Sequence, residues 1–127
     1  MFSKDKLFTI YAIRCKSNSK VYIGRTSVLD ERIKTHFMSL KSGKHTNKLL
    51  LNDYKKYGRD DFEIYILEEN IPYKDRNKEY EYMRQYNSFD EKYGYNKGDI
   101  KKKKVSTITY IKELPFNLYN QSNKIGG

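Results

Sequence analysis

The chain has 127 residues, which is enough for one small domain or for one domain with a tail. It carries 26 basic and 16 acidic side chains, and a net charge of +10 attracts polyanions, of which nucleic acid is the commonest inside a cell. There is no signal peptide and no apolar run of about 18 residues, so we expect neither secretion nor a membrane span. One cysteine, Cys15, and two histidines exclude an internal disulfide and a structural zinc site.

The charge is unevenly distributed along the chain. Residues 1–58 carry 13 basic and 4 acidic side chains, residues 59–96 carry 6 and 10, and residues 97–127 carry 7 and 2. An acidic stretch inside a basic protein suits a metal ion held beside a phosphate backbone. An acidic helix facing solvent would have the same composition.

The first two elements are predicted to form a β-hairpin. Leu7–Arg14 and Lys20–Gly24 are rich in β-branched and aromatic residues, and residues 16–19 between them have turn chemistry. Side chains alternate between the faces of a strand, so Tyr11 and Tyr22 share a face if the loop has an even number of residues. We expect the even loop, which brings two phenols onto one surface.

A helix is predicted next, with Ser27 as its N-cap and Gly43 at its end. Helical spacing predicts a buried stripe of Leu29, Ile33, Phe37 and Leu40. Arg32 and His36 lie four residues apart on one flank of this helix. A second helix is predicted at about residues 46–57.

The remaining elements of the domain are a third strand and a third helix. Phe62–Leu67 has strand composition, and Pro72 is predicted to open a helix over roughly residues 74–86. This helix directs Tyr80 and Met83 inward, with Glu79 beside them. Residues 93–96 then form a turn or a short strand.

The element order predicts an α+β fold, a small mixed domain with a three-stranded antiparallel sheet flanked by about three helices (β-β-α-α-β-α). We expect this domain to span residues 1–98. Four consecutive lysines, residues 101–104, follow it, and Pro115 interrupts a later strand-like stretch. Residues 99–127 are therefore predicted to be a basic C-terminal extension or linker.

Two tripeptides on the hairpin, Thr9-Ile10-Tyr11 and Tyr22-Ile23-Gly24, have ten residues between their tyrosines. They are followed in order by Arg32, His36, His45, Glu79 and Gly94-Tyr95-Asn96. In this ordered set the chain resembles the GIY-YIG endonuclease family, most closely the catalytic domains of phage and intron-encoded homing endonucleases. The resemblance covers about residues 7–98. Thr9 replaces the first glycine of the signature, a minor departure because that position shapes the backbone more than the chemistry.

The resemblance implies a DNA endonuclease that hydrolyses phosphodiester bonds, either homing-type or stand-alone. Phosphodiester hydrolysis needs an activated water, a cation for the phosphate and help for the leaving oxygen. Glu79 would hold one Mg²⁺, for which Mn²⁺ could substitute, and Arg32 would bind the phosphate. The family implies Tyr11 as the general base, with Tyr22 positioning phosphate or water and His36 accepting or relaying a proton. No small-molecule cofactor is expected.

The basic first half of the chain is expected to bind phosphates, with little sequence information. We assign substrate binding to Gly24, Arg25, Lys34, His45, Asn96, Lys101 and Lys102. Further lysines on the hairpin, the first helix and the following loop extend this surface: Lys16, Lys20, Lys41, Lys44 and Lys48. The run from Lys101 to Lys104 either extends the track or is a solvated linker.

Each residue also has a structural interpretation. Tyr11 and Tyr22 would serve equally as core tyrosines, Glu79 as a solvated carboxylate, Arg32 as the partner of a nearby acid and Asn96 as a turn former. The main alternative function is a non-catalytic nucleic-acid-binding module on the same fold. A basic interaction protein unrelated to nucleases is a third.

The setting of the protein is expected to be intracellular, in the cytoplasm of a host cell. A composition rich in Lys, Tyr, Asn and Ile fits an AT-rich phage or viral genome. We expect a monomer, with dimerisation on DNA left open. Target sequence, strand count and a separate DNA-binding domain are outside what the residues determine.

Overall fold

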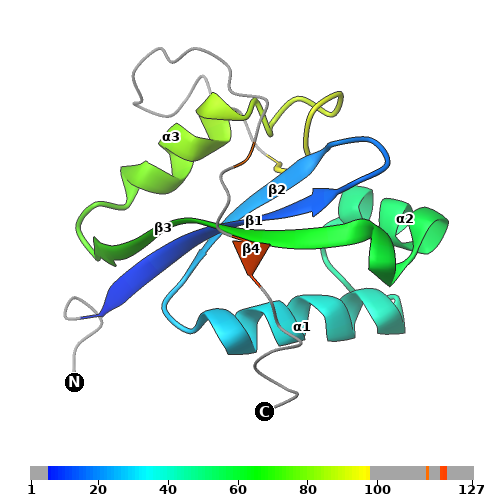
Figure 1. Cartoon of the computed structure of the whole chain (residues 1–127), viewed down its shortest axis with the longest axis horizontal. Helices are drawn as coiled ribbons and strands as arrows, with labels where there is room; N and C mark the ends of the chain where they lie inside the picture. Colours follow the sequence, from blue (N-terminus) through cyan, green and yellow to red (C-terminus); the bar gives the residue numbers. More distant parts are fainter. Residues whose placement is uncertain (1–5, 98–113, 115–117, 120–127) are drawn as a thin grey trace.

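The structure is a computed structural model that describes residues 6–97, 114 and 118–119. Within these residues an antiparallel sheet with the strand order β2-β1-β3-β4 lies between helices (Figure 1). The strands are β1 (Leu7–Cys15), β2 (Val21–Thr26), β3 (Phe62–Pro72) and β4 (Leu118–Tyr119). The predicted α+β class and element order are confirmed, and β4 adds a fourth strand to the three that were predicted.

The hairpin register sets the directions of the two signature tyrosines. Tyr11 lies opposite Gly24, and Ile13 lies opposite Tyr22. Since side chains alternate along each strand, Tyr11 and Tyr22 share one face of the sheet, as the even loop predicted. Their ring centroids are 6.4 Å apart.

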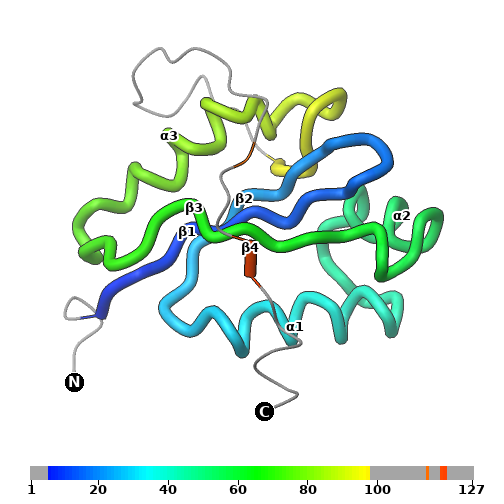
Figure 2. The backbone as a smooth tube through the Cα atoms, viewed as in Figure 1, coloured from blue at the N-terminus to red at the C-terminus, as the bar shows by residue number. Residues whose placement is uncertain are grey.

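Helices cover both faces of the sheet. Helices α1 (Leu29–Ser42) and α2 (Lys48–Tyr57) lie on one face, and α3 (Asn77–Gln85) lies on the other (Figures 1 and 2). A short 3₁₀ helix, η2 (Arg59–Asp61), joins α2 to β3. Two apolar cores follow from this layering. The first includes Tyr11, Ile13, Ile33, Leu40, Leu50 and Phe62, and the second includes Ile10, Ala12, Ile23, Ile71 and Met83.

The predicted ends of two helices are wrong. The N-cap of α1 is Val28 and not Ser27, and no side chain caps the helix. The hydroxyl of Thr26 instead accepts a hydrogen bond from the N–H of Val28, at 3.0 Å. The end of α1 at Gly43 is confirmed, with φ +78° in the left-handed region that glycine tolerates.

Pro72 was predicted to open the third helix, and this is also wrong. Pro72 is the last residue of β3, which continues five residues beyond Leu67, and α3 begins only at Asn77. The cause is long-range pairing: Leu7, at the start of β1, lies opposite Pro72. A local signal for a helix start cannot anticipate a partner strand so far away in the chain.

The buried stripe of α1 differs from the predicted one. Ile33, His36 and Leu40 are its buried residues, whereas Leu29 and Phe37 are half-buried. His36 is only 1% exposed. A buried imidazole needs partners for its ring nitrogens, and the site described below supplies them.

Strand β4 joins the sheet from the region that was predicted to be an extension. Leu118 and Tyr119 pair with Tyr65 and Ile64 of β3. Tyr119 is buried in the first core, and its hydroxyl donates a hydrogen bond to the carboxylate of Asp30 on α1. Among the residues described, no helix has the length and apolar character needed to cross a membrane.

Candidate active site

Tyr11 lies at the centre of the candidate site. Its side chain is 1% exposed, and its hydroxyl is 2.7 Å from Nε2 of His36 on α1. Gly24, opposite it on β2, leaves room for the phenol, because a Cβ there would lie 2.4 Å from the hydroxyl oxygen. The glycine of the second tripeptide is therefore needed for the close approach of Tyr11 to β2.

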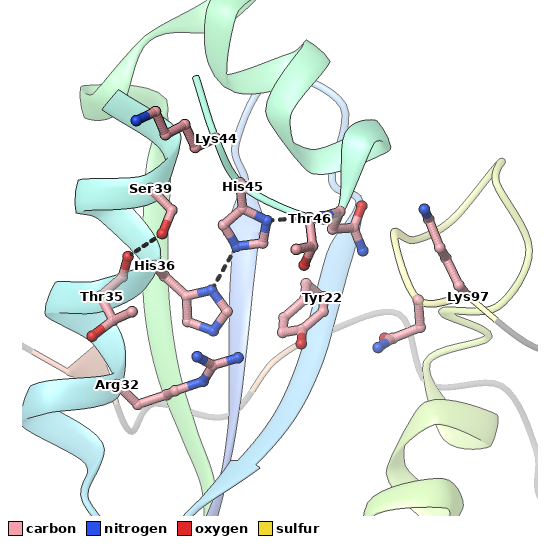
Figure 3. A pocket seen from close by; sticks show the side chains of 11 residues that line it. Tyr22, Arg32, Thr35, His36, Ser39, Lys44, His45, Thr46 and Lys97 are labelled. Carbon is pink, nitrogen blue, oxygen red and sulfur yellow. Dashed lines mark hydrogen bonds between the residues drawn. The ribbon is translucent and has the colours of Figure 1, made fainter. Parts of the chain in front are cut away.

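Two histidines extend from Tyr11 toward α2. Nδ1 of His36 is 2.8 Å from Nε2 of His45, and Nδ1 of His45 accepts the backbone N–H of Asn47 at 3.0 Å (Figure 3). Burial lowers the pKa of His36 to about 3, with the charge of Arg32 adding to the effect. Burial also lowers the pKa of His45, again assisted by Arg32. Both rings are therefore neutral at physiological pH.

Arg32 and Glu79 bring opposite charges to the two phenols. The guanidinium of Arg32 extends from α1 toward His36 and Tyr22 (Figure 3). Burial raises the pKa of both tyrosines, the negative charge of Glu79 raises it further, and Arg32 opposes the rise in both. Tyr11, Tyr22, Arg32, His36 and Glu79 are thus brought within electrostatic range of one another.

A cleft of about 570 Å³ opens over this group. Its lining residues come from β2, α1, the loop before α2 and the segment after α3: Tyr22, Arg32, Thr35, His36, Ser39, Lys44, His45, Thr46, Asn47, Asn96 and Lys97. Tyr22 and His36 pack edge to face, with ring centroids 5.3 Å apart. Tyr11 is not part of the lining and lies behind it.

Asn96 fastens the outer edge of β2. Its side-chain oxygen accepts the N–H of Ile23 at 2.9 Å, and its side-chain nitrogen donates to the carbonyl of Ile23 at 3.0 Å. The amide takes the place of a neighbouring strand at this point. Since Ile23 lies between Tyr22 and Gly24, Asn96 holds the part of β2 that faces the cleft.

Some of the predicted substrate-binding residues lie elsewhere. Arg25 is on the opposite face of β2 from Tyr22 and Gly24, and its guanidinium lies 4.3 Å from the ring centroid of Phe8. Lys34 is exposed on α1 and does not line the cleft. Lys101 and Lys102 lie outside the described residues.

Asn47 is the site residue that the sequence did not indicate. Its side-chain oxygen accepts the N–H of Leu50 and so caps α2, and its side-chain nitrogen donates to the carbonyl of Tyr95 at 2.7 Å. These two bonds fix the backbone N–H that meets His45. An Asn at the start of an apolar helix was the available signal, and the helix was predicted to begin at residue 46 instead. Lys97, which lines the cleft, was also missed.

The donor chemistry of the site suits a hard, hydrated cation. In the described part of the chain no group of three or more His, Cys, Asp or Glu side chains could enclose a metal. Mg²⁺ keeps several of its waters and is commonly held by one or two carboxylates. Glu79, whose charge acts on both phenols, is a carboxylate of that kind, so the residues present fit such an ion.

Comparison with known proteins places this arrangement in a family. Over 64 residues the chain is 42% identical to Intron-associated endonuclease 1 of Enterobacteria phage T4, a match covering 50% of this chain and 25% of that protein. The chain thus matches about a quarter of the length of that relative.

Solved structures extend the likeness to the fold. A crystal of the catalytic domain of the homing endonuclease I-TevI matches with a TM-score of 0.64 and 36% identity, covering 72% of this chain and 99% of that one. A point-mutant form of the catalytic domain of intron endonuclease I-TevI matches with a TM-score of 0.62 and 33% identity, over 81% and 98% of the two chains. Residues 7–96 match the GIY-YIG catalytic domain. The chain belongs to the GIY-YIG family.

Proposed function

We propose that the protein is a metal-dependent DNA endonuclease that hydrolyses phosphodiester bonds. The observation that supports this most is the convergence of two phenols and a guanidinium beside a single carboxylate, at the wall of one cleft. These are the groups that phosphodiester hydrolysis requires. The chain's relatives include an intron-associated endonuclease and a homing endonuclease, so a homing-type or stand-alone nuclease fits them.

In this proposal each side chain has a separate task. Arg32, which lines the cleft, neutralises a phosphate oxygen and interacts with both phenols. Tyr22 contacts the phosphate or the attacking water, and Tyr11, directly behind it, is the general base. Glu79 holds one Mg²⁺ or Mn²⁺, which when bound supplies positive charge to the scissile phosphate.

The proposed substrate is DNA, bound through its phosphates. Lys44 and Lys97 line the cleft, and Lys48 and Lys97 line a second hollow beside it. If about six phosphates are neutralised, affinity should fall by roughly a thousandfold between 50 and 200 mM salt. A nearly flat salt dependence would contradict phosphate-based binding.

The test is cleavage of supercoiled plasmid with Mg²⁺ and with chelator. Glu79→Ala should bind DNA as wild type does and cut it at least a hundredfold more slowly, because the proposed ion has no other carboxylate ligand. Glu81→Ala is the matched control: it removes a carboxylate from the same helix whose charge acts on Tyr82. Tight binding by wild type without cleavage at any Mg²⁺ or Mn²⁺ concentration would favour a non-catalytic binding module.

The same plasmid assay addresses assembly and setting. We propose a monomer acting inside a host cell, as the phage origin of the T4 relative would suit. A cleavage rate proportional to protein concentration supports a monomer, and a rate that rises with its square supports pairing on DNA.

A further inference from the structure

The hydrogen bonds from Asn47 to Tyr11 have only one consistent direction. The backbone N–H of Asn47 faces Nδ1 of His45 at 3.0 Å, and an amide N–H can only donate. Nδ1 of His45 therefore carries a lone pair and no proton. A neutral imidazole has one N–H, so the proton of His45 is on Nε2.

The second link transmits this choice to His36. Nε2 of His45 is 2.8 Å from Nδ1 of His36, and the ring planes are 18° apart with centroids separated by 5.1 Å. That separation is the one expected for two imidazoles joined edge to edge through this N···N contact, since stacked faces would lie closer. Nε2–H of His45 donates to Nδ1 of His36, which leaves the proton of His36 on Nε2.

The last link reaches Tyr11. Nε2 of His36 is 2.7 Å from the Tyr11 hydroxyl oxygen, so His36 donates to that oxygen and has no lone pair facing it. A histidine held in this way cannot take the phenolic proton. It can stabilise the phenolate, because a donor fixed in place favours the charged form of its acceptor.

We propose that His45 is a positioning residue that fixes His36 as a hydrogen-bond donor to Tyr11, so that His36 stabilises deprotonated Tyr11 and is not the acceptor of its proton. This proposal rests on the proposed nuclease function for its consequence, but not for its geometry. It replaces the expectation that His36 accepts or relays a proton. The phenolic proton leaves to solvent, after which Tyr11 is free to take one from the attacking water.

The surrounding charges are consistent with this direction. Arg32, Tyr22 and Glu79 face Tyr11, and Arg32 and Lys48 act on the histidines. Two of these groups are cations that oppose a charge on either imidazole. A doubly protonated His36 would direct an N–H at the N–H of His45, and a doubly protonated His45 would do the same to Asn47.

The first measurement is ¹⁵N NMR of the two imidazoles in the wild-type protein at pH 7, without DNA. We expect both rings to have a protonated Nε2 and an unprotonated Nδ1. A proton on Nδ1 of His36, or a doubly protonated ring, would overturn the proposal. Because no cleavage is measured, an inactive protein with these tautomers would contradict the proposed function and leave the tautomer assignment intact.

The second measurement compares variants that keep or remove the donor. The amide of Gln has an N–H₂ close to where His has Nε2, so His36→Gln can still donate to Tyr11, whereas His36→Met cannot. We expect cleavage by His36→Gln within about tenfold of wild type and a loss of roughly a hundredfold or more for His36→Met. Equal loss in both variants would mean that a proton acceptor is needed, and would overturn the proposal.

The same comparison at His45 tests the positioning role. His45→Gln retains a donor to Nδ1 of His36, and His45→Met removes it. The His36 tautomer and the cleavage rate should persist in His45→Gln, whereas in His45→Met the His36 resonances should show a mixture of tautomers. An unchanged His36 tautomer in His45→Met would show that His45 does not set it, against the proposal.

Discussion

The phenol of Tyr11 lies directly over Gly24 of the neighbouring strand, and no side chain fits between them. A Cβ at position 24 would be 2.4 Å from both Cζ and the hydroxyl oxygen of Tyr11. Gly24→Ala must therefore displace the hydroxyl that His36 holds at 2.7 Å. We expect cleavage to fall at least tenfold, with a loss of about 1–3 kcal/mol in the free energy of unfolding from overpacking.

The control for this prediction is a glycine far from the phenols. Gly43 has φ +78°, and a Cβ there would meet nothing within 4 Å. Gly43→Ala should cost about 1–2 kcal/mol of stability through backbone strain alone and leave cleavage unchanged. Similar losses of activity in both variants would mean that stability, and not the position of Tyr11, determines the effect.

Removing Arg32 is expected to move the pH dependence of cleavage. Arg32 opposes the rise that burial causes in the pKa of Tyr11, so without it that pKa is higher still. If deprotonated Tyr11 is the active form, the rate should rise with pH on the alkaline side, and Arg32→Ala should shift that rise to higher pH. The maximal rate should also fall by roughly a hundredfold.

Lys34→Ala is the matched control, because Lys34 is an exposed cation of the same helix outside the cleft lining. Its pH profile should match that of the wild type. Arg32→Ala should remain folded, since Arg32 is exposed. An unfolded Arg32→Ala protein would instead indicate a structural role.

Asn96→Ala should destabilise the protein through β2. The substitution removes two hydrogen bonds, of 2.9 and 3.0 Å, and leaves the N–H and C=O of Ile23 without them. We expect a loss of about 2–3 kcal/mol, measured by urea unfolding. Lys97→Ala, at the exposed next residue, should change stability by less than about 0.5 kcal/mol. Equal stabilities for the two variants would contradict the edge-fastening role of Asn96.

Acid should destabilise the fold through the buried histidines. The pKa of His36 is lowered to about 3 in the folded protein, below its value of 6.5 in the unfolded chain. The unfolded state therefore binds the proton first, so this contribution is fully present above pH 6.5 and is lost as the pH falls from 6.5 toward 3. The slope should approach about 1.4 kcal/mol per pH unit for each such histidine.

The window between pH 6.5 and 5 isolates this effect from the ordinary titration of carboxylates. Urea midpoints for wild type and for His36→Gln should converge as the pH falls through it, because the variant has no imidazole at position 36 to charge. Parallel curves would mean that His36 is not the source of the acid sensitivity.

Local patterns predicted the elements that depend on local chemistry. The hairpin parity followed from loop length, and the end of α1 at Gly43 followed from the backbone freedom of glycine. The extension of β3 to Pro72 and the addition of β4 depend on partners distant in the chain. Sequence periodicity carries no record of such partners.

The site was predicted in its residue types and not in its contacts. The ordered tyrosines, Arg32 and Glu79 were found from the motif, and the structure brings them together. His45 was given a place in substrate binding, whereas its ring nitrogens are engaged by His36 and Asn47. The direction of those bonds depends on a backbone N–H of Asn47, and a backbone group has no signature in the sequence.

The pairing of β4 with β3 bears on how this nuclease domain could be excised for fusion to other DNA-targeting modules. Cutting the chain after Gly98 would delete the partner of Ile64 and Tyr65, and would remove the Tyr119 side chain from the core beside Asp30. The exposed flank of β3 would then be open to strand exchange with a second molecule. A chimaera whose junction lies after residue 119 keeps that flank covered and should stay dispersed at concentrations where the shorter fragment self-associates.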